Sequence, residues 1–421
     1  MGALAQFQGL LGIVLLLLLA WAISEDRSNL PGWRWIAGAL AMQAVLALVV
    51  LRVPFVWSLM GYANEGVAAI ERATLRGSSY MFGYLGGAEL PFALRDGAEP
   101  PLIIAFQILP LVIVFSALAA VLWHWGVLQW LVRGLSFMLR RTLGVSGVVG
   151  LAGGANMFLG VVESPLVTRA YFEKVSRSEL FAIMVLAMAT ISGAILILYA
   201  QTLSATVPNA VGHMISASLI SLPAALLFAR IMVPGDVKTA EDRDAPGLKY
   251  DNTIDAVIRG TMDGLQLFLA VIAVIIVIFA LVALADQILA LLPLVSGEPV
   301  SVGRLFGWLF APLMWAIGVP WSEAVDAGAL MGKKAVLNEY VAYLELAALP
   351  DETFSSRSEL IVTYALCGVA NFASIGLLVS TIGTLCPARK AEVAGLGIRS
   401  WIAGNAATAM TGAMVGLVTF G

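Results

Sequence analysis

The sequence NMFLGVVESP, residues 156–165, lies inside an apolar run that extends from about Val145 to Tyr171. The run is too long for a strand of a soluble core, and several glycines, a carboxylate and a proline interrupt it. A carboxylate at membrane depth is costly and normally faces a cavity or a partner, and non-helical backbone at that depth lines protein or water. We therefore expect two half-helices that meet at a break, with Glu163 at the break. The alternative is a single kinked transmembrane helix in which Glu163 is satisfied.

Composition places the chain in the membrane. Of its 421 residues, 60% are hydrophobic and 12% are charged, whereas soluble domains carry about 25% charged residues. The net charge of -3 gives no reason to expect a nucleic-acid partner. The two cysteines, Cys367 and Cys386, do not have the spacing of a metal site or a disulfide framework. We find no nucleophile–base pair, so we expect an all-α polytopic membrane protein that is not an enzyme and holds no cofactor.

Eight segments each offer about 20 mostly apolar residues, enough to cross a hydrocarbon core of roughly 30 Å. They are residues 6–23, 34–52, 103–124, 179–203, 211–233, 264–285, 359–380 and 397–419. Residues 62–76, 125–141 and 249–263 mix charged and apolar side chains and are predicted to be interfacial helices, the third of them continuous with the span that follows. Residues 145–175 and 301–346 are apolar but broken, and are predicted to be re-entrant hairpins.

An internal repeat organises these segments. The pentapeptide SRSEL at 176–180 recurs at 356–360, each time after a broken segment and at the start of a span with a polar interruption. Three spans separate the two hairpins, so the copies have opposite orientations, as in many secondary transporters. An excess of Lys and Arg on one face then predicts that both termini are outside. The resulting division is 1–140 (N-terminal spans and scaffold), 141–235 (first transport repeat), 236–300 (polar loop and scaffold span) and 301–421 (second transport repeat).

The first break offers oxygen atoms that suit a small cation. Unwound backbone carbonyls at such breaks coordinate cations in transporters. Asn156 supplies a side-chain oxygen close to the Leu159 carbonyl, and the interruption at Thr190, Ile191 and Ser192 can add hydroxyl or carbonyl oxygens. The set is either a Na+ site or a place where Asn156 simply caps a helix end.

The second set of polar residues suits a neutral ligand with hydroxyl groups. Glu163 and Glu339, brought together by pseudo-symmetry, would accept hydrogen bonds from vicinal hydroxyls. Asn371 and Ser374 lie three residues apart on one helical face and offer further donors and acceptors. The alternative for this second pair is hydrogen bonding between helices. Lys333 and Lys334 are expected to extend to the membrane interface.

Three motifs together resemble the concentrative nucleoside transporter family. They are GVPW at 318–321, LNEYVAY at 337–343, and SEL at 358–360 followed by YALCGVANFASIG at 364–376. The resemblance runs from about residue 140 to the C-terminus and is dense over 315–410. It implies a homotrimer in the bacterial inner membrane with eight spans, two re-entrant hairpins and cation-coupled nucleoside uptake.

The resemblance also implies roles for individual residues. Glu163 and Glu339 would bind ribose hydroxyls or the base edge, and Asn371 and Ser374, beside Phe372, would bind ribose. Asn156, the Leu159 carbonyl and the turn formed by Thr190, Ile191 and Ser192 would bind the cation, which is Na+ or alternatively H+.

The first hairpin departs from the family pattern. Sodium-coupled members typically read Gly-Gln-Thr/Ser-Glu, whereas this chain has Gly160, Val161, Val162 and Glu163. Two valines cannot hydrogen-bond a nucleobase, and a site without polar partners no longer discriminates through them. Purine, modified or broadly varied nucleosides therefore stay open as substrates, and a passive channel or an ion antiporter stays open as an alternative to a symporter.

Overall fold

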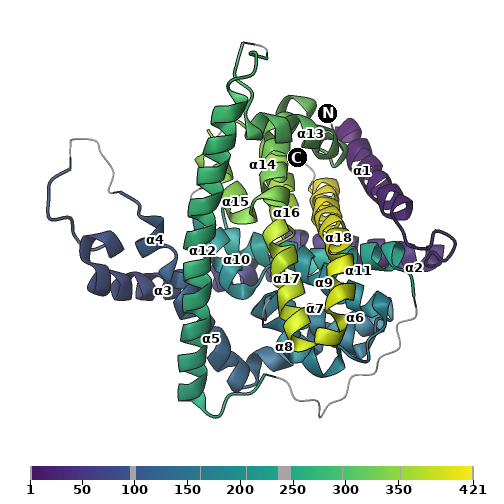
Figure 1. The fold of residues 1–421 in the computed structure, drawn as a ribbon, viewed down its shortest axis with the longest axis horizontal. Helices are drawn as coiled ribbons and strands as arrows, with labels where there is room; N and C mark the ends of the chain where they lie inside the picture. Colours follow the sequence, from purple (N-terminus) through teal and green to yellow (C-terminus); the bar gives the residue numbers. More distant parts are fainter. Residues whose placement is uncertain are drawn as a thin grey trace.

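The computed structural model describes residues 2–94, 101–161, 163–204, 206–235, 248–295, 297–350 and 352–419, with side chains described from Gln8 onward. Across these ranges the chain forms helices and no β-strand (Figure 1). The predicted all-α class is therefore confirmed.

Six helical segments of the described chain are long and apolar enough to cross a membrane. They are α2 (Trp33–Arg52), α4 with α5 (Ile104–Gln107, Pro110–His124), α9 with α10 (Arg177–Ala189, Gly193–Thr202), α11 (Ala210–Met232), α12 (Thr253–Leu289) and η3 with α18 (Pro387–Arg389, Lys390–Val418). The other two expected spans correspond to α1 (Gly2–Ala22) and to α16 with α17 (Ser356–Leu366, Phe372–Leu385), which a break separates. Both ends of the chain lie at the same end of the molecule (Figure 1), as an even number of crossings requires.

Two of the three expected interfacial helices form as separate elements. They are α3 (Pro54–Phe82), which is longer than predicted because Pro54 pre-sets the first helical position, and α6 (Val127–Leu143). The third, over 249–263, is the polar start of the following span, and the predicted continuity of the two is confirmed. Asn252 caps a single 37-residue helix, α12, through a 2.9 Å hydrogen bond from the Asp255 amide, so the polar segment and the following span are continuous. At 1.5 Å per residue α12 is about 55 Å long and extends beyond the hydrocarbon core.

Both broken segments contain helical hairpins. The first consists of α7 (Gly147–Leu159), α8 (Ser164–Thr168) and η2 (Arg169–Tyr171). In the second, which covers the predicted 301–346, α13 (Val302–Ala316) meets α14 (Trp321–Val336) at a bend of 118°. Gly318, with φ of 117°, and Pro320 make that bend. A further break separates α14 from α15 (Glu339–Ala348), and we refer to α14 with α15 as the second hairpin.

The repeated pentapeptide begins a helix in both halves, in two registers. Ser176 caps α9 in a capping box with Glu179. In the second copy Ser355 is the cap of α16, and its hydroxyl accepts a hydrogen bond from the Ser358 amide. The second helix therefore starts one residue earlier relative to the shared sequence. In each half a broken helix pair follows, and α18 packs against α9, α11, α16 and α17 in the core.

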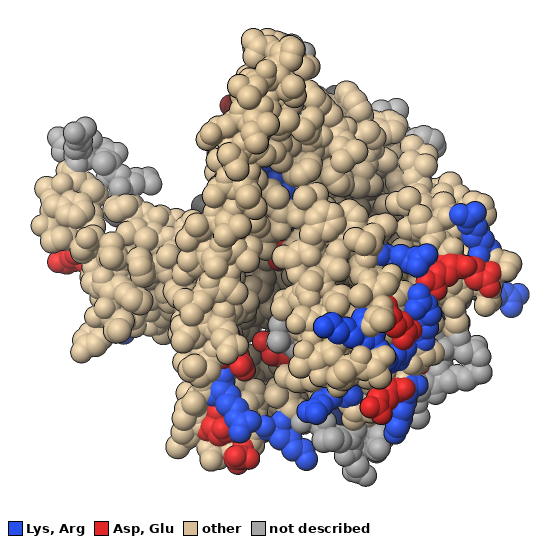
Figure 2. All heavy atoms as spheres, in the orientation of Figure 1, with Lys and Arg blue, Asp and Glu red and all other residues tan. Residues whose placement is uncertain are grey.

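Charged side chains gather over one part of the face drawn in Figure 2, near the start of α12 and beside α18, and most of the remaining face is uncharged. One group of ion pairs on this surface links separate parts of the chain. Glu25, in the loop after α1, lies 2.8 Å from both Arg177 and Arg399. The hydrogen bond from Arg177 is the largest reason that the pKa of Glu25 lies below its ordinary value.

Candidate functional site

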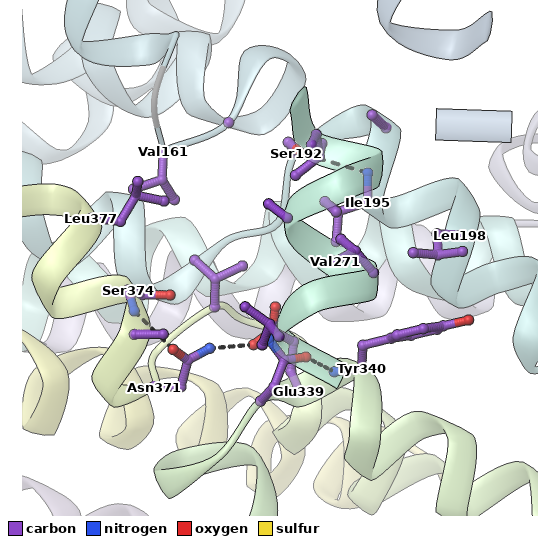
Figure 3. Close-up of a pocket in the computed structure, with 18 of the residues that line it drawn as sticks. Val161, Ser192, Ile195, Leu198, Val271, Glu339, Tyr340, Asn371, Ser374 and Leu377 are labelled. Carbon is purple, nitrogen blue, oxygen red and sulfur yellow. Dashed lines mark hydrogen bonds between the residues drawn. The ribbon is translucent and has the colours of Figure 1, made fainter. Parts of the chain in front are cut away.

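Four helix breaks meet at one cavity of about 450 Å³ (Figure 3), a volume typical of ligand sites. The α7–α8 break contributes Leu159, Gly160, Val161 and Glu163; the α9–α10 break contributes Ser192; the α14–α15 break contributes Asn338 and Glu339; and the α16–α17 break contributes Val369, Asn371 and Ser374. Breaks leave backbone groups and polar caps free of the helical ladder. The cavity lies against α12, and the surface is hollowed beside that helix in Figure 2.

Both carboxylate oxygens of Glu339 accept hydrogen bonds in the cavity. It begins α15 and is only 4% exposed. One carboxylate oxygen accepts a hydrogen bond of 2.6 Å from Asn371 Nδ2, and the other accepts one of 2.5 Å from Tyr199 Oη. Donors on both oxygens suit a carboxylate, which only accepts.

Asn371 has two roles at once. Its Oδ1 caps α17 by accepting a 2.8 Å hydrogen bond from the Ser374 amide, and its Nδ2 donates to Glu339 (Figure 3). Asn371 therefore lines the proposed ligand site and also makes a hydrogen bond between helices, the two roles that its sequence position suggested. The cap fixes the amide, and the amide in turn orients the carboxylate.

Gly160 shapes the tip of the first hairpin. Its φ of 98° is a conformation that L side chains rarely adopt, and a Cβ atom there would lie 2.9 Å from Ser192 Cβ and 3.1 Å from Glu163 Oε2. The hairpin tip therefore rests closely on the α9–α10 break. This contact brings Glu163 into the same cavity as Glu339.

Of the residues predicted from the sequence to contact the substrate, Val161 lines the cavity and Phe372 does not. Val162 lies outside the described residues, whereas its neighbour Val161 lines the cavity, as does Leu377 (Figure 3). Phe372 is not among the lining residues, and its ring stacks on Trp401 with the centroids 5.0 Å apart. Phe372 follows Asn371 directly at the start of α17, so its side chain leaves the helix on another face.

The predicted cation-binding residues also lie together. Asn156 is 1% exposed, and its Nδ2 donates a 2.6 Å hydrogen bond to Thr190 Oγ1. Its Oδ1 is buried and has no hydrogen-bond partner in the described part of the chain. Ser192 caps α10 by accepting a hydrogen bond from the Ile195 amide, and the Ile191 amide donates to Ser218. A buried acceptor without a partner is costly, and a cation that prefers oxygen ligands would satisfy it.

Sequence reasoning missed Tyr199 and the apolar wall. Tyr199 follows Ser192 by seven residues, which is two helical turns, so spacing from the break could have indicated it. The wall consists of Leu267, Val271, Val274 and Ile275, one face of α12. No sequence signal singles out this face, because α12 is apolar all round over this stretch.

The expectation that both lysines of α14 extend to the interface was wrong for Lys334. This side chain is fully buried and donates hydrogen bonds of 2.8 Å to Asn405 Oδ1 and 2.9 Å to Thr408 Oγ1, both on α18. Lys333 instead pairs with the partly exposed Glu345 of α15. Lys334 therefore links the second hairpin to the core helix.

Comparison with known proteins gives a consistent result along almost the whole chain. Residues 213–416 match the family model of the Na+ dependent nucleoside transporter C-terminus, residues 11–85 that of its N-terminus, and residues 105–206 that of nucleoside recognition. An uncharacterized transporter, YutK of Bacillus subtilis, is 35% identical over 97% of this chain and 98% of its own length. The nucleoside permease NupC of Helicobacter pylori is 30% identical over 96% of each chain.

Solved structures are similar as well. The structure of CNTnw in an inward-facing substrate-bound state is 34% identical, covers 98% of both chains and superposes with a TM-score of 0.87. A variant of CNTnw in an outward-facing state gives a TM-score of 0.86 at 33% identity, over 98% of this chain and 97% of that one.

Proposed function

This chain belongs to the bacterial concentrative nucleoside transporter family, and we propose that it imports nucleosides across the cytoplasmic membrane as a secondary active symporter driven by Na+. The observation that carries the proposal is the composition of the cavity. Glu339, Asn371 and Ser374 line it with polar groups, and the face of α12 that lines it is apolar. A nucleoside has the same division, with a hydroxyl-bearing sugar joined to a flat base.

In this arrangement the sugar binds to the polar side of the cavity and the base lies on the apolar side. Glu339 and Asn371 bind ribose hydroxyls, with Ser374 beside them, and Glu163 accepts from the sugar or the base edge. Val161, Ile195 and Val369 contact the base without hydrogen bonds from their side chains. Nucleobases that differ in their hydrogen-bond donors and acceptors should therefore all be accepted. A site rejects the wrong base only when polar side chains of the protein would be left unpaired by it.

Sodium is the coupling ion that the first break supports. The unpartnered Oδ1 of Asn156, with oxygens from Leu159, Thr190, Ile191 and Ser192, forms the proposed ligand set. The set lies beside the hairpin tip that carries Glu163, so Na+ would order the tip against the α9–α10 break. Proton coupling through the buried carboxylates is the alternative.

Alternating access would carry the two hairpins and the broken helix pairs past a scaffold that includes α5 and α12. The surface that α12 turns to the cavity is apolar, which leaves no hydrogen bonds from these side chains to break during movement. The most apolar stretch of α12 contains no buried residue in the single chain. We propose that lipid and a homotrimer cover the apolar scaffold surface, and that both termini are outside.

Uptake of labelled uridine and adenosine into proteoliposomes tests the proposal, with Glu339→Gln compared with the wild type. The amide loses charge-assisted hydrogen bonds that are each worth about 1.5–3 kcal/mol, so uptake should fall by roughly 10- to 100-fold. Glu345→Gln is the matched control, because this partly exposed carboxylate lies on the same helix but outside the cavity. Normal transport by Glu339→Gln would refute the assigned role.

A further inference from the structure

Lys334 carries a charge into the interior of the chain, in the last turn of α14. Its side chain is completely buried, and the ammonium donates to Asn405 Oδ1 and to Thr408 Oγ1, neither of which lines the cavity. A buried charge is costly unless an opposite charge compensates it. The Glu339 carboxylate, at the start of α15, attracts this ammonium. Lys334 is therefore placed behind the break that presents Glu339 to the cavity.

Asn405 connects Lys334 to the other break that carries proposed sugar-binding residues. A lysine has no acceptor, so the oxygen of the Asn405 amide faces it. The amide nitrogen donates hydrogen bonds of 2.9 Å to the carbonyl of Ala370 and 3.0 Å to that of Trp401. Ala370 is completely buried and directly precedes Asn371 in the α16–α17 break. One side chain of α18 thus joins the end of α14 to the residue before Asn371.

These hydrogen bonds and the backbone close a ring behind the cavity. The ring runs from Lys334 through Asn405 to Ala370. It continues to Asn371 and crosses to Glu339 by the 2.6 Å hydrogen bond drawn in Figure 3. The two helix breaks are therefore held together twice, by a hydrogen bond at the cavity and by the Asn405 amide behind it. Groups that are held in place before a ligand binds save the free energy of ordering them.

We propose that Lys334 and Asn405 are positioning residues of the sugar site. They hold the α14–α15 and α16–α17 breaks at a fixed separation, so that the carboxylate and the amide there are aligned for ribose hydroxyls before a nucleoside binds. This inference rests on the proposed function, which gives neither residue a part. It predicts an effect on nucleoside affinity that can be separated from the effect on stability.

Asn405→Asp separates the two effects. The new carboxylate still accepts the hydrogen bond from Lys334, and it compensates the buried ammonium better than an amide does. It has no N–H group, so the buried Ala370 carbonyl loses its donor. We expect the KM for uridine to rise by about 5- to 100-fold, the range that corresponds to one unsatisfied buried acceptor. The maximal rate should stay within about twofold, because the substitution weakens binding of the ground state.

Thr408→Val is the matched control. It removes the other acceptor of Lys334 with little change in shape, and it leaves the hydrogen bond from Asn405 to Ala370 in place. It should lower the melting temperature without raising the KM for uridine. An equal rise of KM in Thr408→Val and Asn405→Asp would mean that any disturbance of α18 alters the site, and would overturn the inference.

The lysine is tested by Lys334→Met, with its neighbour as the control. Lys333 pairs with the partly exposed Glu345, and neither residue lines the cavity. Only Lys334→Met should raise the KM for uridine, by at least about fivefold. Equal KM values in Lys334→Met and Lys333→Met would overturn the part assigned to Lys334.

A Na+ titration without nucleoside shows whether the effect is confined to the sugar site. The ring does not include the α7–α8 break, so the Na+ concentration that gives half-maximal thermal stabilisation should be the same in Asn405→Asp and in the wild type. A rise of this concentration as large as the rise of the uridine KM would mean a general loosening of the helix breaks, and would contradict a positioning role.

Uptake of labelled uridine into proteoliposomes, over a range of uridine concentrations, gives both the KM and the maximal rate. An unchanged KM in folded Asn405→Asp would overturn the inference and leave the proposed function intact. If Asn405→Asp does not fold, the comparison of Lys334→Met with Lys333→Met decides in the same way. Uptake of no nucleoside by the wild type would remove the proposed function and the inference together.

Discussion

Replacing Asn156 by alanine should uncouple the transporter from Na+ with little change in its stability without Na+. In the absence of a cation the Oδ1 atom of Asn156 is a buried acceptor without a partner, which costs about 1–3 kcal/mol. The substitution removes that cost together with the 2.6 Å hydrogen bond to Thr190, which is worth about 1 kcal/mol. The two effects nearly cancel, so the melting temperatures in Na+-free buffer should be similar.

With Na+ present the two proteins should differ. In the wild type the cation binds Oδ1 and relieves the penalty of about 1–3 kcal/mol, whereas the variant has no oxygen there. At 1.4 kcal/mol per factor of ten, the Na+ concentration for half-maximal effect should rise by about 5- to 100-fold.

The assay is a titration of NaCl at constant ionic strength, with choline chloride as the replacement. Thermal stability and nucleoside binding are both recorded. Ser164→Ala is the matched control, because Ser164 is buried in the same hairpin and its hydroxyl donates to the Ala152 carbonyl, whereas the Asn156 side chain bonds Thr190. A variant whose half-maximal Na+ concentration lies within twofold of the wild-type value would refute the proposed ligand set.

Three further predictions concern other parts of the molecule. Gly160→Ala should reduce uptake at least tenfold, because the backbone there has a positive φ and the new Cβ would lie too close to Ser192 in the α9–α10 break. Gly134→Ala, in open space on α6, is the control and should transport normally. Equal uptake rates for the two variants would contradict the close contact at Gly160. Lys334→Met should lower the free energy of unfolding by about 2 kcal/mol, because two acceptors on α18 lose their donor. Lys333→Met, which breaks a partly exposed ion pair, should lower it by less than about 1 kcal/mol. A lower melting temperature for Lys333→Met than for Lys334→Met would be evidence against the buried link. The pKa of Glu25 is held below its ordinary 4.5, chiefly by the arginine that begins α9, so the stability that it contributes is present above pH 4.5 and is lost as the pH falls through the lowered pKa. In thermal melts between pH 7 and 3.5, the melting temperature of Glu25→Gln should therefore fall less with acidification than that of the wild type. An identical fall in both proteins would show that the ion pairs of Glu25 do not contribute to stability.

Much of the architecture could be predicted because membranes restrict the options for a chain. Helices that span a membrane need long apolar runs, and polar residues inside such runs mark breaks. The repeated pentapeptide then predicted the order of hairpin and broken span in both halves. Glu163, Glu339, Asn371 and Ser374 were proposed because each interrupts an apolar segment, and the fold places all four in the lining of one cavity.

The predictions failed where three-dimensional contacts alone decide the outcome. Lys334 was expected at the interface because its long side chain can reach it, but α18 supplies two oxygen acceptors that only the folded chain brings near. Phe372 was assigned to the site through its neighbours, and the direction of its side chain on α17 places it on Trp401. The α13–α14 bend depends on the backbone of Gly318, which apolar composition does not reveal.

The most direct test of Na+-driven nucleoside import is accumulation in sealed proteoliposomes of labelled nucleoside above its equilibrium concentration. Three conditions are compared: an inward Na+ gradient, equal Na+ on both sides, and an inward H+ gradient without Na+. We predict accumulation under the Na+ gradient only, with equilibration but no accumulation when Na+ is equal. Accumulation under the H+ gradient alone would contradict sodium coupling, and equilibration without accumulation under every gradient would contradict active transport.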